Sequence, residues 1–202
     1  MVIDPIELSA LEAYKLATSL IVPRPIAWVG SRSESGVDNL APFSYFMGVS
    51  SKPPSIAISV ARGRGGSLKD TATNILNTGE FSVSVVSHSM KDPMVQSSLP
   101  MPPTVSEFEA VGLAASNCAA VNAPHPTEAA ATMECRLVHS HDMGSTHLFV
   151  GEVVQYRFAD GVLVEDERGH RTVDINALDA IGRLGGYSYC RITERFELRP
   201  QK

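Results

Sequence analysis

The chain has 202 residues, a length typical of one domain, and 44% of them are hydrophobic, which is enough for a substantial core. Its formal net charge of −5 argues against nucleic acid as a partner, because phosphate binding needs a strongly basic face. No apolar run approaches the roughly 20 residues of a membrane helix, and the acidic N-terminus does not match a secretory signal, so neither a membrane protein nor a secreted one is expected.

The first half of the chain predicts short strands separated by turns. Residues 25–31 are apolar and rich in strand formers, and residues 32–36 carry a hairpin signal. A second extended segment spans residues 37–51, with Pro42 in its middle, which places that part at an edge or a bulge. Residues 55–61 alternate like a third strand.

One clear helix is predicted, over residues 67–78 and closed by Gly79. Ser67, with Asp70 three positions later, matches a capping box. A strand over residues 81–87 and a short helix over residues 91–99 follow.

The last part of the chain is rich in loops and strands. Residues 100–127 read as a loop that covers a site or serves a subunit surface. Residues 132–141 and 147–158 form a long hairpin, and residues 161–164 and 191–198 are further short strands. Short strands with one clear helix predict a mainly β fold, a β-barrel with flanking helices, as a single domain over residues 1–202.

The cysteines indicate a reducing compartment. Cys118, Cys135 and Cys190 are odd in number and far apart, which favours buried thiols over disulfides. We therefore expect a cytoplasmic protein.

The best candidate anion site is the junction between a glycine-rich loop and the predicted helix. Glycines allow close backbone approach, and the first helical turn has free N–H donors. Charge comes from Arg62, Arg64 and Lys69, and hydroxyls come from Ser67 and Thr71. The alternative is a solvated surface loop before a capped helix. Neither a P-loop nor a Rossmann glycine motif is present.

A second candidate site is the segment 39–46, N-L-A-P-F-S-Y-F. Small residues, a proline and aromatics on an interrupted strand can present backbone polar groups and ring faces to a flat heterocycle. The alternative is a bulged strand whose aromatics pack in the core.

Three histidines raise the question of a metal site. His139 and His141 share one strand face and His147 lies across the turn, but no Cys, Asp or Glu has a convincing ligand spacing. We expect no metal. Serine hydrolysis is disfavoured because the GxSxG nucleophile motif is absent.

Several motifs in order resemble the flavin reductase-like, FMN-binding split-barrel family, including flavoredoxin. They are R-P-I-A-W-V-G-S (24–31), N-L-A-P-F-S-Y-F (39–46), S-S-K-P-P (50–54), K-D-T-A-T-N-I (69–75), G-E-F-S-V-S (79–84) and H-L-F-V-G-E-V (147–153). The resemblance implies an FMN-binding split β-barrel, a homodimer, and redox activity with NADH or NADPH as the usual electron source.

The resemblance also implies roles for individual residues. Those that would line the flavin ring are Asn39, Ala41, Pro42, Phe43, Ser44 and Tyr45. Those that would hold the phosphate or the ribityl chain are Lys69, Thr71 and Asn74, with help from Arg62 and Ser67. His147 would lie near the flavin and the nicotinamide as the catalytic residue.

One position departs from the family pattern. Flavoredoxin-like relatives often carry Asp-Lys-Phe where this chain has Ser106-Glu107-Phe108, so a basic residue near the flavin is replaced. Three functions stay open. The first is an NAD(P)H-dependent flavin reductase that serves free flavin, a flavin-dependent oxygenase or a small acceptor. The others are a flavoredoxin-like FMN electron carrier and a binding module that has lost the flavin.

Overall fold

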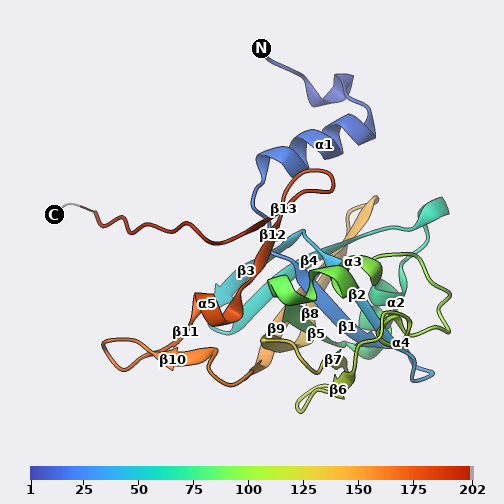
Figure 1. The fold of residues 1–202 in the computed structure, drawn as a ribbon. Helices are drawn as coiled ribbons and strands as arrows, with labels where there is room; N and C mark the ends of the chain where they lie inside the picture. Colours follow the sequence, from blue (N-terminus) through green and yellow to red (C-terminus); the bar gives the residue numbers. More distant parts are fainter. Residues whose placement is uncertain (201–202) are drawn as a thin grey trace.

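Seven antiparallel strands form the main sheet of the computed structural model, which describes residues 1–200 (Figure 1). They are β1 (Ala27–Arg32), β2 (Asp38–Phe43), β3 (Phe46–Ser51), β4 (Pro54–Ala61), β5 (Glu80–Val85), β8 (Ala131–Asp142) and β9 (Thr146–Phe158). Their order in space is β2-β1-β5-β8-β9-β4-β3, so β2 and β3, consecutive in the chain, form opposite edges. Ser44 and Tyr45 connect these edges, and the Ser59 amide donates to the Tyr45 carbonyl at 2.9 Å. The sheet therefore curls into a barrel whose edges meet at this connection.

Short helices and hairpins surround the barrel. The helices are η1 (Pro5–Glu7), α1 (Ala10–Leu20), η2 (Arg64–Gly66), α2 (Asp70–Thr78), η3 (His88–Met90), α3 (Lys91–Gln96), α4 (Glu107–Ala110) and α5 (Ile175–Leu178). Three hairpins pair β6 (Ala115–Asn117) with β7 (Pro124–Pro126), β10 (Leu163–Glu165) with β11 (Arg171–Val173), and β12 (Ile181–Arg183) with β13 (Tyr189–Arg191). Within residues 1–200, no helix has both the length and the apolar character needed to cross a membrane.

Alternating side chains build two cores on the two faces of the sheet. The barrel interior is filled by a cluster that includes Phe81, Val83 and Phe149, each with no exposed surface. A second cluster lies outside the barrel, where Trp28 and Phe108 pack with residues of α3. The central strands of the barrel therefore each have a buried side, which fixes their register, whereas the edge strand β3 is largely exposed.

The expected strands are largely confirmed. Segments 25–31, 55–61 and 81–87 correspond to β1, β4 and β5, and the long hairpin is β8–β9. Pro42 lies in the edge strand β2, as its missing N–H requires.

The extended segment 37–51 is instead two strands, because the chain turns at residues 44–45 to reach the other edge. The strand expected over 191–198 is wrong: β13 ends at Arg191, and no strand among residues 1–200 pairs with the segment that follows.

Helix α1 is an element that the strand-based prediction missed. Ser9 and Glu12 form a capping box at its start, with the Ser9 amide donating to the Glu12 carboxylate at 3.0 Å. Only Thr18 of this helix is buried, and the helix stands above the barrel beside the β12–β13 hairpin (Figure 1). An S-x-x-E pattern in the sequence was the available signal.

Arg24 holds α1 and this hairpin to the barrel. Its side chain is 4% exposed and donates hydrogen bonds to the carbonyls of Thr18, Ile21 and Leu184. Its Nε also reaches the Ser44 hydroxyl at 3.3 Å. A buried guanidinium needs all of its donors satisfied, so the four partners are held together.

Gly30 marks the tightest approach in the barrel wall. A Cβ built on this residue of β1 would lie 2.0 Å from the Pro124 carbonyl oxygen and 2.6 Å from the Ser82 hydroxyl. Gly48, in the edge strand β3, has nothing within 4 Å of the same position. The chain therefore needs glycine at position 30 for packing, and not at position 48.

We expect Gly30→Ala to lower the free energy of unfolding by about 3 kcal/mol, because backbone must move to admit the methyl group. Gly48→Ala, the matched control, should change the free energy of unfolding by less than about 0.5 kcal/mol. Urea denaturation of both variants measures the difference. Equal effects at the two positions would contradict the packing at β1.

Candidate functional site

The glycine-rich loop leads into a helix that starts later than the sequence predicts. Helix α2 begins at Asp70 rather than Ser67, and no side chain among residues 1–200 caps the amides of its first turn. The Ser67 hydroxyl contacts the Arg64 carbonyl at 3.4 Å instead, because the backbone at Ser67 is extended. The predicted capping box is therefore wrong, and its absence leaves the first-turn N–H groups to a ligand.

A cavity of about 470 Å³ opens in front of this helix start. Its walls come from β2, the loop and start of α2, and the loop after α3. The lining residues are Asn39, Ala41, Gly63, Arg64, Ser67, Leu68, Lys69, Asp70, Thr71, Ser97, Ser98, Leu99, Pro100, Met101, Pro103 and Glu107. We call it the helix-end cavity. Part of the loop-rich segment 100–127 therefore covers the candidate site.

A second cavity, of about 410 Å³, lies against the segment after β2. Its lining residues are Ala10, Tyr14, Thr18, Pro42, Phe43, Ser44, Tyr45, Ser59, Ala61, Lys69, Ser145, Thr146 and Arg183. We call it the ledge cavity, after the ledge formed by residues 42–45. Lys69 lines both cavities, so the two adjoin at its side chain.

The structure brings together most of the residues that the sequence singled out. Ser67, Lys69 and Thr71 line the helix-end cavity with Asn39 and Ala41, and the whole ledge lines the other cavity. The walls from α1 and from Arg183 were not predicted. They are more than 150 residues apart in the chain, and the Arg24 hydrogen bonds help bring them to one place.

Arg62, predicted to help hold the phosphate, lies outside both cavities. Its guanidinium donates to the carbonyls of Gly66 and Gly144 at 2.9 and 2.8 Å and to Asp142 at 2.6 Å. The Gly144 amide and this arginine lower the pKa of the Asp142 carboxyl. Arg62 therefore ties the glycine-rich loop to the β8–β9 turn.

A buried hydrogen-bond network underlies the helix-end cavity. The Asn39 side-chain oxygen accepts from Thr71 at 2.8 Å and from Ser31 at 3.1 Å, and Asn74 donates to Ser31 at 3.1 Å. The Asn39 amide nitrogen donates to both Glu107 oxygens, at 2.9 and 3.0 Å. Asn74 does not line the cavity; it helps hold α2 against β1 and β2.

His147 lies on the interior side of β9. It is 9% exposed, stacks on Phe149 with ring centroids 4.6 Å apart, and lines neither cavity. Neither ring nitrogen has a hydrogen-bond partner within residues 1–200. Thr146, its neighbour in β9, faces the ledge cavity instead. The catalytic role of His147 stays a prediction, and the structure does not bring it to the cavity wall.

The histidine cluster considered for a metal does not form. His139 and His141 are exposed while His147 is interior, and no group of three potential ligands occurs among residues 1–200.

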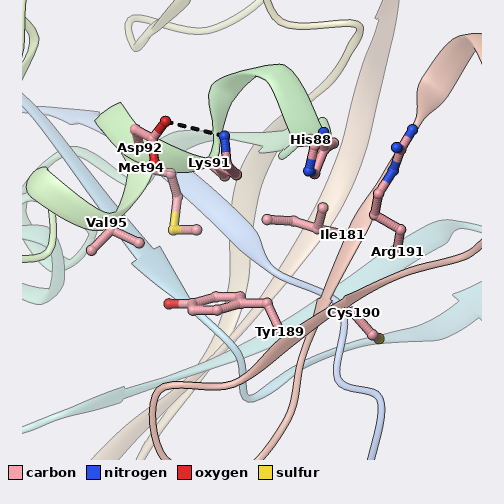
Figure 2. A pocket seen from close by; sticks show the side chains of 9 residues that line it. All are labelled: His88, Lys91, Asp92, Met94, Val95, Ile181, Tyr189, Cys190 and Arg191. Carbon is pink, nitrogen blue, oxygen red and sulfur yellow. Dashed lines mark hydrogen bonds and ion pairs between the residues drawn. The ribbon is translucent and has the colours of Figure 1, made fainter.

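A third cavity, of about 260 Å³, lies between α3 and the β12–β13 hairpin (Figure 2). Its apolar wall includes Met94, Ile181 and Tyr189, and Lys91 pairs with Asp92 at its rim at 3.1 Å. It shares no lining residue with the two adjoining cavities. It is therefore a separate feature of the surface.

Comparison with known proteins decides the family. The model of the flavin reductase like domain matches residues 19–173. The chain belongs to the flavin reductase-like family. Nitrilotriacetate monooxygenase component B from Bacillus cereus is 34% identical, with a TM-score of 0.89 and coverage of 98% of both chains. The 2-nitrobenzoate 2-nitroreductase of Pseudomonas fluorescens is 31% identical, with a TM-score of 0.88 over 100% of this chain and 96% of that one.

The fold of this flavin reductase-like chain is the expected one. A protein of Shewanella frigidimarina NCIMB 400 with a split barrel domain has a TM-score of 0.82, covers 97% of this chain and 96% of its own, and is 21% identical. The expected mainly β split barrel is confirmed. The two adjoining cavities are thus the candidate flavin site of a flavin-related oxidoreductase.

Glu107 occupies the position that departs from the family pattern. Its carboxylate is 6% exposed and accepts from the Leu40 amide at 3.0 Å as well as from Asn39. Burial raises the pKa of the Glu107 carboxyl above its ordinary value of 4.5; the hydrogen bonds from Leu40 and Asn39 oppose this, and the nearby Asp70 charge adds to it. At the position where the resemblance implies a lysine, this chain therefore has an acid whose carboxylate is turned onto β2.

This shift predicts a pH dependence of folding. A carboxyl whose pKa is raised in the folded protein stabilises the fold. Its contribution to the free energy of unfolding is fully present below pH 4.5 and is lost as the pH rises through the raised pKa. The difference in unfolding free energy between the native protein and Glu107→Gln should therefore fall as the pH rises from 4.5 towards 7.

Urea denaturation across that range measures the difference. Glu109→Gln, on the exposed side of the same helix, controls for removal of a carboxylate. A difference that is flat or rises with pH would contradict the assignment.

Proposed function

We propose that the chain binds FMN across the helix-end and ledge cavities and uses it as an NAD(P)H-dependent flavin reductase. The observation that carries the proposal is the position of Lys69, which lines both cavities. One side of this lysine has a helix N-terminus and hydroxyls, which suit a phosphate. The other side has the ledge, which suits a flat ring system.

The phosphate end fits an anion on several counts. The first-turn amides of α2 are free of side-chain caps within residues 1–200, and Arg64, Ser67 and Lys69 surround them. Gly65 and Gly66 have φ angles of 75° and 81°, a backbone shape that glycine adopts without strain. The loop therefore presents backbone and charge together, as phosphate sites require.

The ring end fits a planar heterocycle. Ser44 and Tyr45 join the two edges of the barrel, so the ledge has backbone groups outside the ladder that can hydrogen-bond a ring. Bound FMN would supply the hydride and electron transfer. The residues of this chain would orient the ring through the ledge, balance negative charge through Lys69, and exclude water through α1.

Two observations bear on what receives the electrons. Component B of a monooxygenase is among the similar structures, which supports a flavin-dependent oxygenase as partner. The nitroreductase among them supports a small molecule as acceptor. Glu107 in place of a lysine favours the alternative, a flavoredoxin-like FMN carrier without intrinsic NAD(P)H activity. The free thiols favour the cytoplasm as its compartment.

Reduction of the purified protein distinguishes these functions. We expect FMN-loaded protein to lose its visible absorbance within seconds of anaerobic NADH or NADPH addition, because the ledge cavity leaves space for the donor. A protein that stays yellow until dithionite is added would be a carrier. Failure to take up FMN would contradict the proposal as a whole.

Lys69→Glu tests the phosphate end of the site. Reversal of this charge should weaken FMN binding about 100-fold, since a charge-assisted hydrogen bond is lost and a repulsion is added. Lys91→Glu, at the separate third cavity, is the matched control and should leave FMN affinity unchanged. Fluorescence titration with FMN gives both constants. An unchanged affinity in Lys69→Glu would refute the phosphate assignment.

We also propose a homodimer that uses the exposed apolar side of α1. Leu11 and Leu20 of this helix are 61% and 80% exposed, and Met47 and Val49 of the edge strand β3 are 61% and 51% exposed. Apolar side chains gathered on a helix and an edge strand are typical of subunit interfaces.

Light scattering during gel filtration should give the mass of two chains. Leu20→Glu should shift the protein towards the mass of one chain, because the new carboxylate would have to be buried in the interface. Leu163→Glu, on the separate β10–β11 hairpin, should have no effect. A native protein with the mass of one chain would refute the dimer.

A further inference from the structure

Arg183 is a fixed cation on the wall of the ledge cavity. Its guanidinium donates to the Tyr189 hydroxyl and to the Gly186 carbonyl, both at 2.7 Å. It also lies 4.7 Å from the centre of the Tyr189 ring. Its backbone is held by two hydrogen bonds with Arg24, at 2.8 and 2.9 Å. The side chain is thus positioned before any ligand arrives.

Arg183 has no acidic partner. No carboxylate of residues 1–200 forms an ion pair with it, and its neighbours Tyr189 and Gly186 are neutral. Arg191 of the same hairpin, in contrast, pairs with Asp179 at 2.7 Å. A half-buried guanidinium with unused N–H donors and no counter-charge is suited to bind an anionic ligand.

The charge on the cavity lining points the same way. The ledge cavity is lined by two cations, Lys69 and Arg183, and among residues 1–200 no Asp or Glu lines it. Lys69 also lines the helix-end cavity, where the phosphate of FMN would occupy it, whereas Arg183 does not. Arg183 is therefore left for a second anion, beside the ring.

The rest of this wall indicates what carries that anion. Tyr14, Phe43 and Tyr45 bring aromatic rings to the cavity lining, together with the apolar Pro42 and Ala61. Serine and threonine hydroxyls make up much of the rest of the lining, and Arg183 is its guanidinium. Such a lining suits a small planar body with one negatively charged end. A planar carboxylate also matches the two parallel donors of a guanidinium.

We propose that Arg183 is a specificity-determining residue, which binds the carboxylate of a small aromatic acid next to the flavin ring. This inference rests on the proposed FMN site. The inference names a substrate class for this site, aromatic carboxylates, and the residue that selects them.

Benzoate and its neutral counterpart benzamide are the probes. Each is titrated into FMN-loaded protein, and binding is followed through the visible absorbance of the flavin. We expect benzoate to bind at least about 10-fold more tightly than benzamide, the effect of one charge-assisted hydrogen-bond pair. Equal affinities for the two probes would overturn the proposal without any variant.

Arg183→Gln should remove the preference for benzoate and leave benzamide binding unchanged. Arg183→Lys keeps the charge and should retain part of the preference. It therefore distinguishes the loss of the charge from a general disruption of the β12–β13 hairpin. The matched control is Arg191→Gln, whose side chain extends away from Tyr189 in Figure 2 and should behave as the native protein.

The outcomes separate this inference from the proposed function. Protein that binds no FMN would overturn both. Protein that binds FMN but responds equally to both probes, or an Arg183→Gln variant with the native preference, would overturn the inference alone. A variant with slower NADPH reduction and unchanged benzoate binding would assign Arg183 to the dinucleotide and overturn it as well.

Discussion

The buried guanidinium of Arg24 is the interaction on which one side of the site depends. It has no ion-pair partner within residues 1–200, so backbone carbonyls of Thr18, Ile21 and Leu184, with the Ser44 hydroxyl, satisfy it. A buried cation tolerates the loss of few such acceptors. Helix α1, the β12–β13 hairpin and the ledge are therefore joined through one side chain, in addition to the backbone hydrogen bonds that attach the hairpin to the barrel. Two walls of the ledge cavity come from this one side chain's contacts.

The segment that leads into the ledge is held by a hydrogen-bond network around Asn39. Its amide group connects Thr71 of α2, Ser31 of β1 and Glu107 of α4. Hydrogen bonds in such a buried chain strengthen one another and specify one arrangement. Side-chain hydrogen bonds thus hold Asn39 at one end of the segment 39–44 and Ser44 at the other, without any ligand. Preorganisation of this kind reduces the entropy lost on binding.

The distribution of charge follows from these two anchors. Glu107 is turned inward by its hydrogen bonds to β2, which keeps its carboxylate in contact with Asn39 and Leu40. Lys69 lies where the two cavities adjoin, and Arg183 stands alone on the far wall. The two cations therefore differ in position: Lys69 lines both adjoining cavities, and Arg183 lines the ledge cavity alone.

The sequence by itself determined the features that depend on local pattern. Alternation fixed the barrel strands, glycines and hydroxyls marked the anion loop, and residues 39–46 marked the ledge, because period and turn chemistry are local properties. The face on which His147 lies depended on the pairing of β9, since a shift of one residue exchanges inside for outside. Arg62 donates to Asp142 at the β8–β9 turn, and residues of α1 line one cavity with Arg183. Both arrangements depend on contacts between distant segments. Only the tertiary structure could decide these, because no local pattern encodes which distant carbonyl or carboxylate a long cationic side chain will reach.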